Sequence, residues 1–433
     1  MSSDTFYDQG DYRFINWKDC NMKALVLAGG FPQIDLLCKL KSRGFTTILA
    51  DYTSNPIAKN YADKHYCAST LDVEEIRSIA IKENVDVILT VCTDQALLTV
   101  AQLSEELNLP CYIDYETAKN VTNKEYMKEV FAERGIPSAK YTVIKSVDDF
   151  DSTKWKFPLI VKPVDCNSSK GVRRVNDPDD FKSAVINAVS FSRSSKAIVE
   201  EYIIGKELSV DVYVENGKAK LLDISTSEKL KIQDQFIIFR SWHPANISRI
   251  IRSKVITIIQ QIADAFRINN SPMLVQMIAD SNNVYVIEFS ARTGGGVKHL
   301  SIKHQTGIDV ISLVIDLTLN KEPNITLKKR SHKYMVDEYI YCLPGVFERL
   351  DGFEPLKKNG IILDYYVFKS SNTLLETVKS SGDRIGGFTI EGNTYDELLE
   401  KHQIVNDSVK VLSSSGEDMM RHDFLEEFNM LES

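Results

Sequence analysis

Short apolar runs alternate with helical segments over the first quarter of the chain. The runs Lys23–Ala28, Thr46–Ala50 and Val85–Val91 are separated by segments with helical periodicity at Gln33–Arg43 and Val73–Glu83. Strands joined by helices of this length form a parallel sheet with right-handed crossovers. The spacing therefore predicts an α/β domain that ends near residue 115.

The pattern changes after this first region. A helix is predicted over Asn123–Arg134, because Gly135 and Pro137 follow it as stop signals. Strands, two hairpins and two helices are then predicted over Phe157–Pro163, Arg173–Val175, Pro178–Ser190, Ala197–Tyr202, Glu207–Val214, Ile247–Ala265, Met273–Ala279 and Val284–Ser290. Beyond residue 330 the pattern becomes strands with turns, including a strand at Ile385–Ile390 and a helix at Thr394–His402. A chain of 433 residues is long enough for several domains. The predicted parts are an arm (1–20), an α/β domain (21–115) and two α+β regions (116–330 and 331–433).

Composition and charge exclude several classes of protein. The formal net charge is -8 and no Lys/Arg-rich block is present, which argues against nucleic acid as a partner. The sequence has neither an apolar run of the roughly 20 residues that span a bilayer nor a secretory signal, so no membrane association is expected. Seven Cys without CxxC spacing favour reduced thiols and a cytoplasmic location. P-loop, kinase and GxSxG motifs are absent, so ATP chemistry would need another scaffold.

The stretch from Lys124 to Arg292 carries an ordered set of motifs. They are Asn123-Lys124, Val161-Lys162-Pro163, the small polar loop Asp165–Val172, Val199–Ile203 with Gly205–Asp211, and Leu274-Val275-Gln276 followed by Ile287–Arg292. In this order and spacing they resemble the ATP-grasp superfamily, over roughly residues 23 to 320. The resemblance is greatest to the carbamoyl-phosphate synthase-like, biotin carboxylase-like and amino-acid ligase branches.

The resemblance implies a fold and a cofactor. The fold would combine a Rossmann-like pre-ATP-grasp domain (21–115), a central two-lobed ATP-grasp domain (116–330, split near 205) and a small C-terminal α+β domain (331–433). The cofactors would be ATP and Mg²⁺ or Mn²⁺. Members of the superfamily are often dimers, so the resemblance is also compatible with a homodimer.

Two lysines are candidates for contact with the ATP phosphates. Phosphoryl transfer needs cations over the phosphates, and although a lone lysine usually faces solvent, Lys162 ends an apolar strand and is fixed by Pro163. By resemblance, Lys124 and Lys162 both contact phosphate. Backbone N–H groups of a small polar loop can also cover phosphates, and the resemblance assigns this role to Ser169, Gly171 and Val172. The alternative for the loop is an ordinary surface turn.

The nucleoside contacts follow from the resemblance alone. Glu200 and the main chain of Glu201 and Ile203 would recognise the adenine edge, and Glu207 would accept hydrogen bonds from the ribose hydroxyls. The alternative is a set of charges on a hinge.

Gln276 and Glu288 are the candidate metal ligands. A three-residue loop at 281–283, with Asp280 opposite Val284, predicts that Gln276 lies directly across from Glu288 on one sheet face. A loop of two or four residues would place them on opposite faces. A carboxylate between apolar strands is costly unless it is paired or binds a metal. The alternative is a structural hairpin with one buried salt bridge.

Further candidates surround this hairpin. Ser290 shares the face of Glu288, where family members commonly carry Asn as a metal ligand. By resemblance, Arg292 stabilises the transferring phosphate and the acyl phosphate, as electrostatics favour, so that Arg292 and Lys162 are the catalytic candidates. Gly294–Gly296 could let the backbone approach a substrate or form a flexible loop.

Four weaker candidates lie on the predicted substrate side. Phe239–Pro244, with Arg240 and His243, is interpreted as a loop near the substrate, and Lys298 and His299 are interpreted similarly.

The predicted function is that of an ATP-dependent carboxylate–amine ligase, an enzyme that forms a carbon–nitrogen bond. It would act through an acyl phosphate and release ADP and phosphate, with an amino acid or small metabolite as the carboxylate and a small nucleophile as its acceptor. One alternative is a bicarbonate-activating enzyme of the carboxylase or carbamoyl-phosphate type, against which the lack of an evident glutaminase or biotinyl domain weighs. The other is a non-catalytic nucleotide-binding module, which the joint presence of Lys162, Glu288 and Arg292 disfavours.

Overall fold

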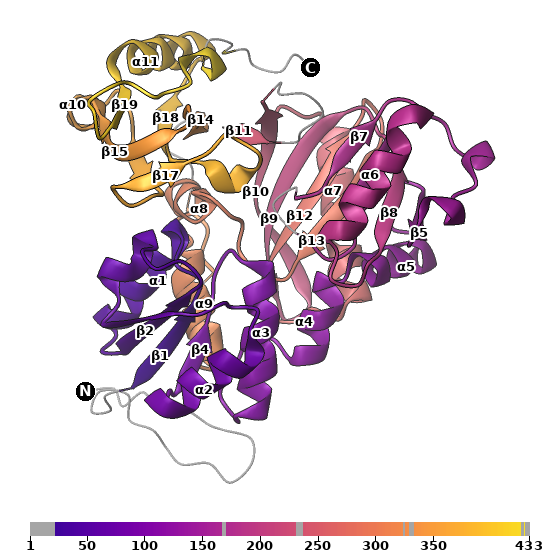
Figure 1. Ribbon diagram of the computed structural model, residues 1–433, viewed down its shortest axis with the longest axis horizontal. Helices are drawn as coiled ribbons and strands as arrows, with labels where there is room; N and C mark the ends of the chain where they lie inside the picture. The colour runs from indigo at the N-terminus through magenta and orange to yellow at the C-terminus, as the bar shows by residue number, and fades with distance from the viewer. Residues whose placement is uncertain are drawn as a thin grey trace.

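The computed structural model describes residues 22–166, 170–230, 237–323, 325–328, 333–425 and 428. The predicted arm (1–20) and Ser169 lie outside the described residues. Mixed α/β structure is present throughout, as predicted (Figure 1).

The N-terminal part is a four-stranded parallel sheet in the order β3-β2-β1-β4. Its strands are β1 (Lys23–Leu27), β2 (Thr46–Asp51), β3 (Lys64–Cys67) and β4 (Val87–Leu89), and its helices are α1 (Phe31–Ser42), α2 (Val73–Glu83) and α3 (Asp94–Glu106). Helix α2 begins and ends at the predicted residues, because Asp72 caps its first turn and Asn84 adopts the left-handed conformation after it. The short edge strand β3 was not predicted, since its KHYC sequence is polar and half-exposed rather than apolar.

Helices α4 (Tyr115–Thr122) and α5 (Lys124–Arg134) lead into a second sheet. The side chain of Asn123 caps α5, and Gly135 ends it with a φ of 66°. The sheet has the order β5-β8-β6-β7 and is antiparallel. Its strands are β5 (Tyr141–Ile144), β6 (Leu159–Pro163), β7 (Arg173–Val175) and β8 (Ala197–Glu201), and α6 (Pro178–Phe191) packs against it.

An eight-stranded antiparallel sheet forms the largest layer, in the order β13-β12-β9-β10-β11-β14-β18-β16. Its strands are β9 (Lys206–Glu215), β10 (Lys218–Lys229), β11 (Ile238–His243), β12 (Ser271–Ala279), β13 (Val284–Ser290), β14 (Tyr334–Ile340), β16 (Asp364–Val367) and β18 (Gly386–Gly392). Helix α7 (Arg249–Ala265) buries its apolar face against this sheet. Since β11 pairs with β14, one sheet continues across the predicted boundary near residue 330.

The remaining elements join the parts. A three-stranded sheet of β17 (Thr373–Leu375), β15 (Gly345–Asp351) and β19 (Lys410–Ser413) lies with α10 (Phe353–Lys358) and α11 (Tyr395–Ser408) in the C-terminal part. Helices α8 (Lys298–Thr306) and α9 (Val310–Thr318) follow the candidate site. Helix α9 lies beside the N-terminal sheet (Figure 1), where Ile311, Val314 and Ile315 share a core with β1 and α1. None of the helices in the described part of the chain has the length and apolar character that a bilayer crossing requires.

Candidate active site

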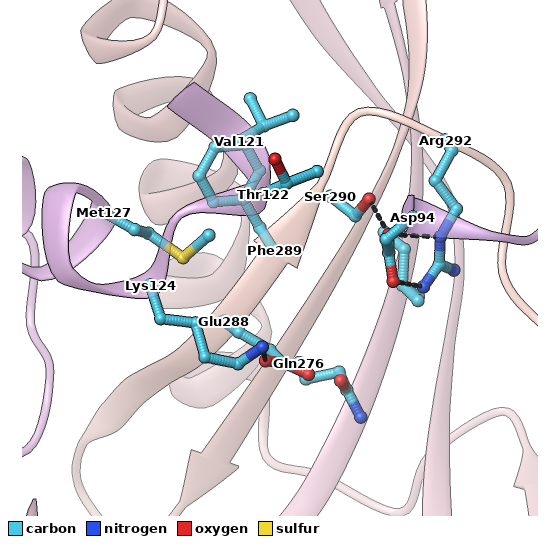
Figure 2. A pocket seen from close by; sticks show the side chains of 11 residues that line it. Asp94, Val121, Thr122, Lys124, Met127, Gln276, Glu288, Phe289, Ser290 and Arg292 are labelled. Atoms are coloured by element: carbon cyan, nitrogen blue, oxygen red, sulfur yellow. Dashed lines mark hydrogen bonds and ion pairs between the residues drawn. The ribbon is translucent and has the colours of Figure 1, made fainter. Parts of the chain in front are cut away.

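A pocket lies where three segments from distant parts of the sequence meet (Figure 2). It is lined by Asp94, Val121, Thr122, Lys124, Met127, Leu274, Gln276, Glu288, Phe289, Ser290 and Arg292. The segments are the start of α3, the junction of α4 and α5, and the β12–β13 hairpin. The pocket therefore brings together five predicted site residues, which are Lys124, three residues on the hairpin (Gln276, Glu288 and Ser290) and Arg292 just after it.

The hairpin reaches this arrangement by a different register from the predicted one. Ala279, not Asp280, lies opposite Val284, so the connection has four residues rather than three. By itself this would put Gln276 and Glu288 on opposite faces. A register shift beside Gln276 compensates, and Gln276 lies opposite Glu288 after all. The predicted loop was wrong and the predicted pair was right.

Glu288 is paired with a lysine. The ammonium Nζ of Lys124 lies 3.0 Å from Glu288 Oε2, with the two side chains 11% and 31% exposed. The same ammonium donates to the carbonyl of Cys166 at 2.8 Å. Burial alone lowers the pKa of Lys124, but the negative charges of Glu288 and Asp94 outweigh it and raise that pKa. The Glu288 carboxylate thus avoids the cost of burial without a partner.

Arg292 is held by an acidic residue that the sequence analysis did not identify. Its Nε and Nη2 donate to Asp94 Oδ1 and Oδ2, both at 2.6 Å, and the Ser290 hydroxyl donates to the same carboxylate. Figure 2 shows Asp94 between the two side chains. Burial raises the pKa of Asp94, but Arg292 outweighs it and the pKa falls below its usual value. Asp94 begins α3 just after β4, and ligand sites gather at the carboxyl ends of parallel strands, which is the signal that could have identified it.

Lys162 and Glu200 lie in a second group on the neighbouring sheet. Lys162 Nζ lies 2.7 Å from Glu200 Oε2, and Lys128 Nζ lies 2.6 Å from Oε1. Burial raises the pKa of Glu200, but the two lysines outweigh it and lower it to about 2. Lys128 was not predicted. Its position four residues after Lys124 places it on the same helix face, a spacing that could have identified it.

The other predicted nucleotide contacts lie around the connection between β8 and β9. Glu201 is exposed, and Ile203 is half-buried. Glu207 forms an ion pair with Lys229. In the loop before β7, Gly171 has a φ of 72°, and a Cβ there would lie 2.9 Å from Phe191 and Pro163. Glycine at this position allows the loop to pack closely against α6.

The predicted substrate-side loop is wrong, because Ile238–His243 is the buried strand β11. Arg240 is 0% exposed and its guanidinium binds Glu338 and Glu228. Strand β11 is buried along most of its length, and its polar side chains Arg240 and His243 find partners on other strands and on α11.

His243 lies between two carboxylates within the same sheet. Its Nδ1 is 2.5 Å from Asp223 and its Nε2 is 3.1 Å from Asp337. Burial lowers the pKa of His243, but the two carboxylates outweigh it and raise the pKa to about 9. The charges stabilise one another inside the sheet, which accounts for the position of His243 without a substrate.

Two of the three glycines after Arg292 pack tightly against neighbouring side chains. A Cβ on Gly294 would lie 2.7 Å from Asp211 Oδ1, and one on Gly296, where φ is 65°, would lie 2.2 Å from the Tyr339 hydroxyl oxygen. Lys298 follows and donates to Asp211 at 2.9 Å. His299 is buried, and desolvation lowers its pKa to about 4. These close contacts fix the chain that follows Arg292.

Comparison with known proteins finds a matching family model and several similar sequences. Residues 155–300 match the model of the ATP-grasp domain. The chain is 22% identical over 344 residues to the carbamoyl phosphate synthase large chain of Clostridium acetobutylicum, covering 74% of this chain and 32% of that one. It is 22% identical over 405 residues to the formate-dependent phosphoribosylglycinamide formyltransferase of Ignicoccus hospitalis, covering 88% and 94%. The match to the Sulfurisphaera tokodaii formyltransferase covers 59% of that protein, so the chain spans only part of some of these relatives.

Solved structures share the fold. The L-amino acid ligase of Bacillus licheniformis has a TM-score of 0.74 at 21% identity, covering 91% of this chain and 99% of that one. The biotin carboxylase domain dimer of the Hydrogenobacter thermophilus 2-oxoglutarate carboxylase, solved with MgADP, ADP and bicarbonate, has a TM-score of 0.73 at 16% identity and covers 90% of each chain. The match over residues 155–300 confirms the predicted ATP-grasp domain in this part of the chain, as the order of its motifs indicated.

Proposed function

We propose that this protein is an ATP-dependent carboxylate–amine ligase that activates its carboxylate as an acyl phosphate and releases ADP and phosphate. The observation that carries the proposal is the pocket in which Lys124, Gln276, Glu288 and Arg292 come together from separate parts of the chain. Transfer of a phosphoryl group depends on positioning and on cations that neutralise the phosphate oxygens.

The oxygen donors of the pocket fit Mg²⁺ or Mn²⁺. Gln276 offers an amide oxygen directly across the strand pair from the carboxylate of Glu288, and both are half-buried. Magnesium prefers such oxygen ligands and commonly uses only one or two carboxylates. No group of three His, Cys, Asp or Glu side chains suited to a metal occurs in the described ranges, so the phosphates and water would complete the shell. When bound, the metal would supply Lewis-acid polarisation of the phosphoryl group. The Ser290 hydroxyl, which donates to Asp94, would be a weaker third ligand.

The chain's own cations surround the same region. Lys124 and Lys162 would hold the nucleotide phosphates, and Arg292 would neutralise charge on the transferring group. The Asp94 carboxylate accepts from Nε and Nη2 of Arg292 and so fixes the guanidinium. A guanidinium held in one orientation can act on developing charge without reorganising. Glu200, Glu207 and the main chain of Glu201 and Ile203 would bind the nucleoside, and Gly171 and Val172 the phosphates.

The substrate class rests on the relatives. D-alanine–D-alanine ligases are 26% identical to this chain over 55% of its length, and the L-amino acid ligase shares its fold. An amino acid or small metabolite as the carboxylate is therefore proposed first. Activation of bicarbonate is the second candidate, favoured by the fold shared with a biotin carboxylase domain. Because that neighbour is a dimer, we also propose a homodimer for this chain.

The products distinguish acyl-phosphate chemistry from adenylation. With Mg-ATP, amino acids and small acids should be screened in pairs, with bicarbonate in a separate series, for release of ADP and phosphate. We expect ADP with an equal amount of phosphate in the presence of the correct pair. AMP and pyrophosphate as the main products would contradict the ligase proposal, and turnover with bicarbonate alone would favour the second candidate.

Nucleotide binding should also protect the phosphate loop. If the backbone N–H groups of Gly171 and Val172 contact phosphate, Mg-ATP should slow their hydrogen exchange by at least about tenfold, because each amide gains an acceptor and loses contact with water. Exchange at the hairpin turn Asn216-Gly217 serves as the control, since that turn lies at the end of β9 opposite to its connection with β8. Unchanged exchange at Gly171 with saturating Mg-ATP would contradict a phosphate role for the loop.

A further inference from the structure

Two lysines share one carboxylate in the sheet beside the pocket. Lys128, Lys162 and Glu200, here called the two-lysine cluster, are 1%, 4% and 5% exposed. Each oxygen of Glu200 has its own lysine, with Lys128 Nζ 2.6 Å from Oε1 and Lys162 Nζ 2.7 Å from Oε2. Lys162 carries a proposed phosphate role, and Lys128 approaches the same carboxylate from α5.

Three separate elements fix the cluster. Lys128 comes from α5, Lys162 from the end of β6 and Glu200 from β8, which pairs with β6. The Lys128 ammonium also donates to the Ser138 hydroxyl at 2.6 Å, so it is anchored on two sides. Lys128 lies one helical turn beyond Lys124, which reaches into the pocket. The cluster and the pocket are therefore linked through one face of α5.

The cluster has more positive than negative charge. Burial and the neighbouring Lys162 lower the pKa of Lys128, and Glu200 opposes this. Two lysine side chains face a single carboxylate, which cannot neutralise two ammonium groups. A buried excess of charge is unfavourable until a counter-ion arrives. The polyphosphate of a nucleotide would supply that negative charge.

We propose that Lys128 is a positioning residue for the nucleotide phosphates. By holding Oε1 of Glu200, it prevents that carboxylate from neutralising Lys162 alone and leaves Lys162 with positive charge for the phosphates. Lys128 does not itself touch the nucleotide. The inference rests on the proposed function, because it requires ATP to bind between the lobes.

The test compares ligands that differ in phosphate number. Dissociation constants for ATP, ADP and adenosine are measured by calorimetry with the full chain and with Lys128→Met. We expect Lys128→Met to weaken ATP and ADP binding by at least about tenfold and adenosine binding by less than about threefold, because the lost charge acts on phosphate. Lys128→Arg keeps the charge and should retain ATP affinity within about threefold. Lys196→Met is the matched control, since Lys196 pairs with Glu125 on α5 outside the cluster and should leave all three constants unchanged.

A charge-balanced variant separates charge from shape. Lys128→Met combined with Glu200→Gln returns the cluster to a single positive charge, so its ratio of adenosine to ATP dissociation constants should recover toward that of the unaltered protein.

Should Lys128→Met fail to fold, Glu200→Gln alone leaves two unopposed lysines and must raise this ratio. An equal loss for adenosine and ATP would show a structural role for Lys128 and overturn the inference. Unchanged ATP affinity in folded Lys128→Met would overturn it too. Failure of the unaltered chain to bind Mg-ATP at all would instead contradict the proposed function.

Discussion

Glu288→Gln should lower ADP release by at least about a hundredfold while leaving the fold intact. The change keeps the size of the side chain and removes the main protein charge facing the proposed metal, because Gln276 can offer only a neutral oxygen. Turnover in the presence of the correct substrates and excess Mg²⁺ is the measurement. Nucleotide affinity should fall less, since Lys162, Glu200 and Glu207 would keep their contacts.

The stability of this variant tests the structural alternative. The Glu288 side chain is 31% exposed and pairs with one lysine, Lys124, at 3.0 Å. Such a partly exposed pair contributes up to about 1 kcal/mol, so the thermal melting temperature should change little. Glu125→Gln is the matched control, because Glu125 is 27% exposed and pairs with Lys196 at 2.7 Å. A marked loss of thermal stability with near-normal turnover would mean that Glu288 is only a structural ion-pair partner.

Arg292→Lys should lower turnover by about a hundredfold or more, although the positive charge is retained. Arg292 binds both oxygens of Asp94 through Nε and Nη2, at 2.6 Å each. A lysine cannot reproduce this planar fork, so its ammonium would lie in a different place relative to the transferring phosphate. Single-turnover release of ADP measures the effect on chemistry directly. Nucleotide affinity, measured separately, should change by less than about tenfold because the other cations remain.

A second arginine provides the control for this change. Arg43 donates to Asp316 at 2.6 Å, in the contact of α1 with α9 and away from the pocket. Arg43→Lys should therefore leave the single-turnover rate unchanged. A rate for Arg292→Lys within about threefold of the unaltered protein would contradict the assignment of Arg292 to the transferring phosphate.

The sequence by itself determined the local elements and the order of the motifs. Helix α2 and the start of α5 follow from caps at Asp72 and Asn123, because a side chain within three residues satisfies the first free N–H groups. The ends of both helices follow from residues that accept a left-handed conformation. Lys162 could be recognised because it ends an apolar strand beside Pro163. Each of these signals lies within a few residues of the helix end or strand end that it determines.

Only the tertiary structure decided which groups meet. The predicted pairing of Gln276 with Glu288 depended on loop length, yet a local register shift in the strand pair restored it. Side-chain direction along a strand alternates, so one added residue anywhere in the hairpin reverses the result. Such a shift depends on packing against neighbouring strands, which the hairpin sequence does not contain.

The partners of the charged groups were also settled by the tertiary fold. Asp94 meets Arg292 across 198 positions of sequence, and Lys128 meets Glu200 across 72. His243 was interpreted as a loop residue, and the carboxylates that hold it, Asp223 and Asp337, lie on other strands. A buried charge is tolerated only where an opposite charge comes close in space. Spacing along the chain reveals such a pair when it lies on one helix or hairpin, whereas pairs between distant segments exist only once the sheets have assembled.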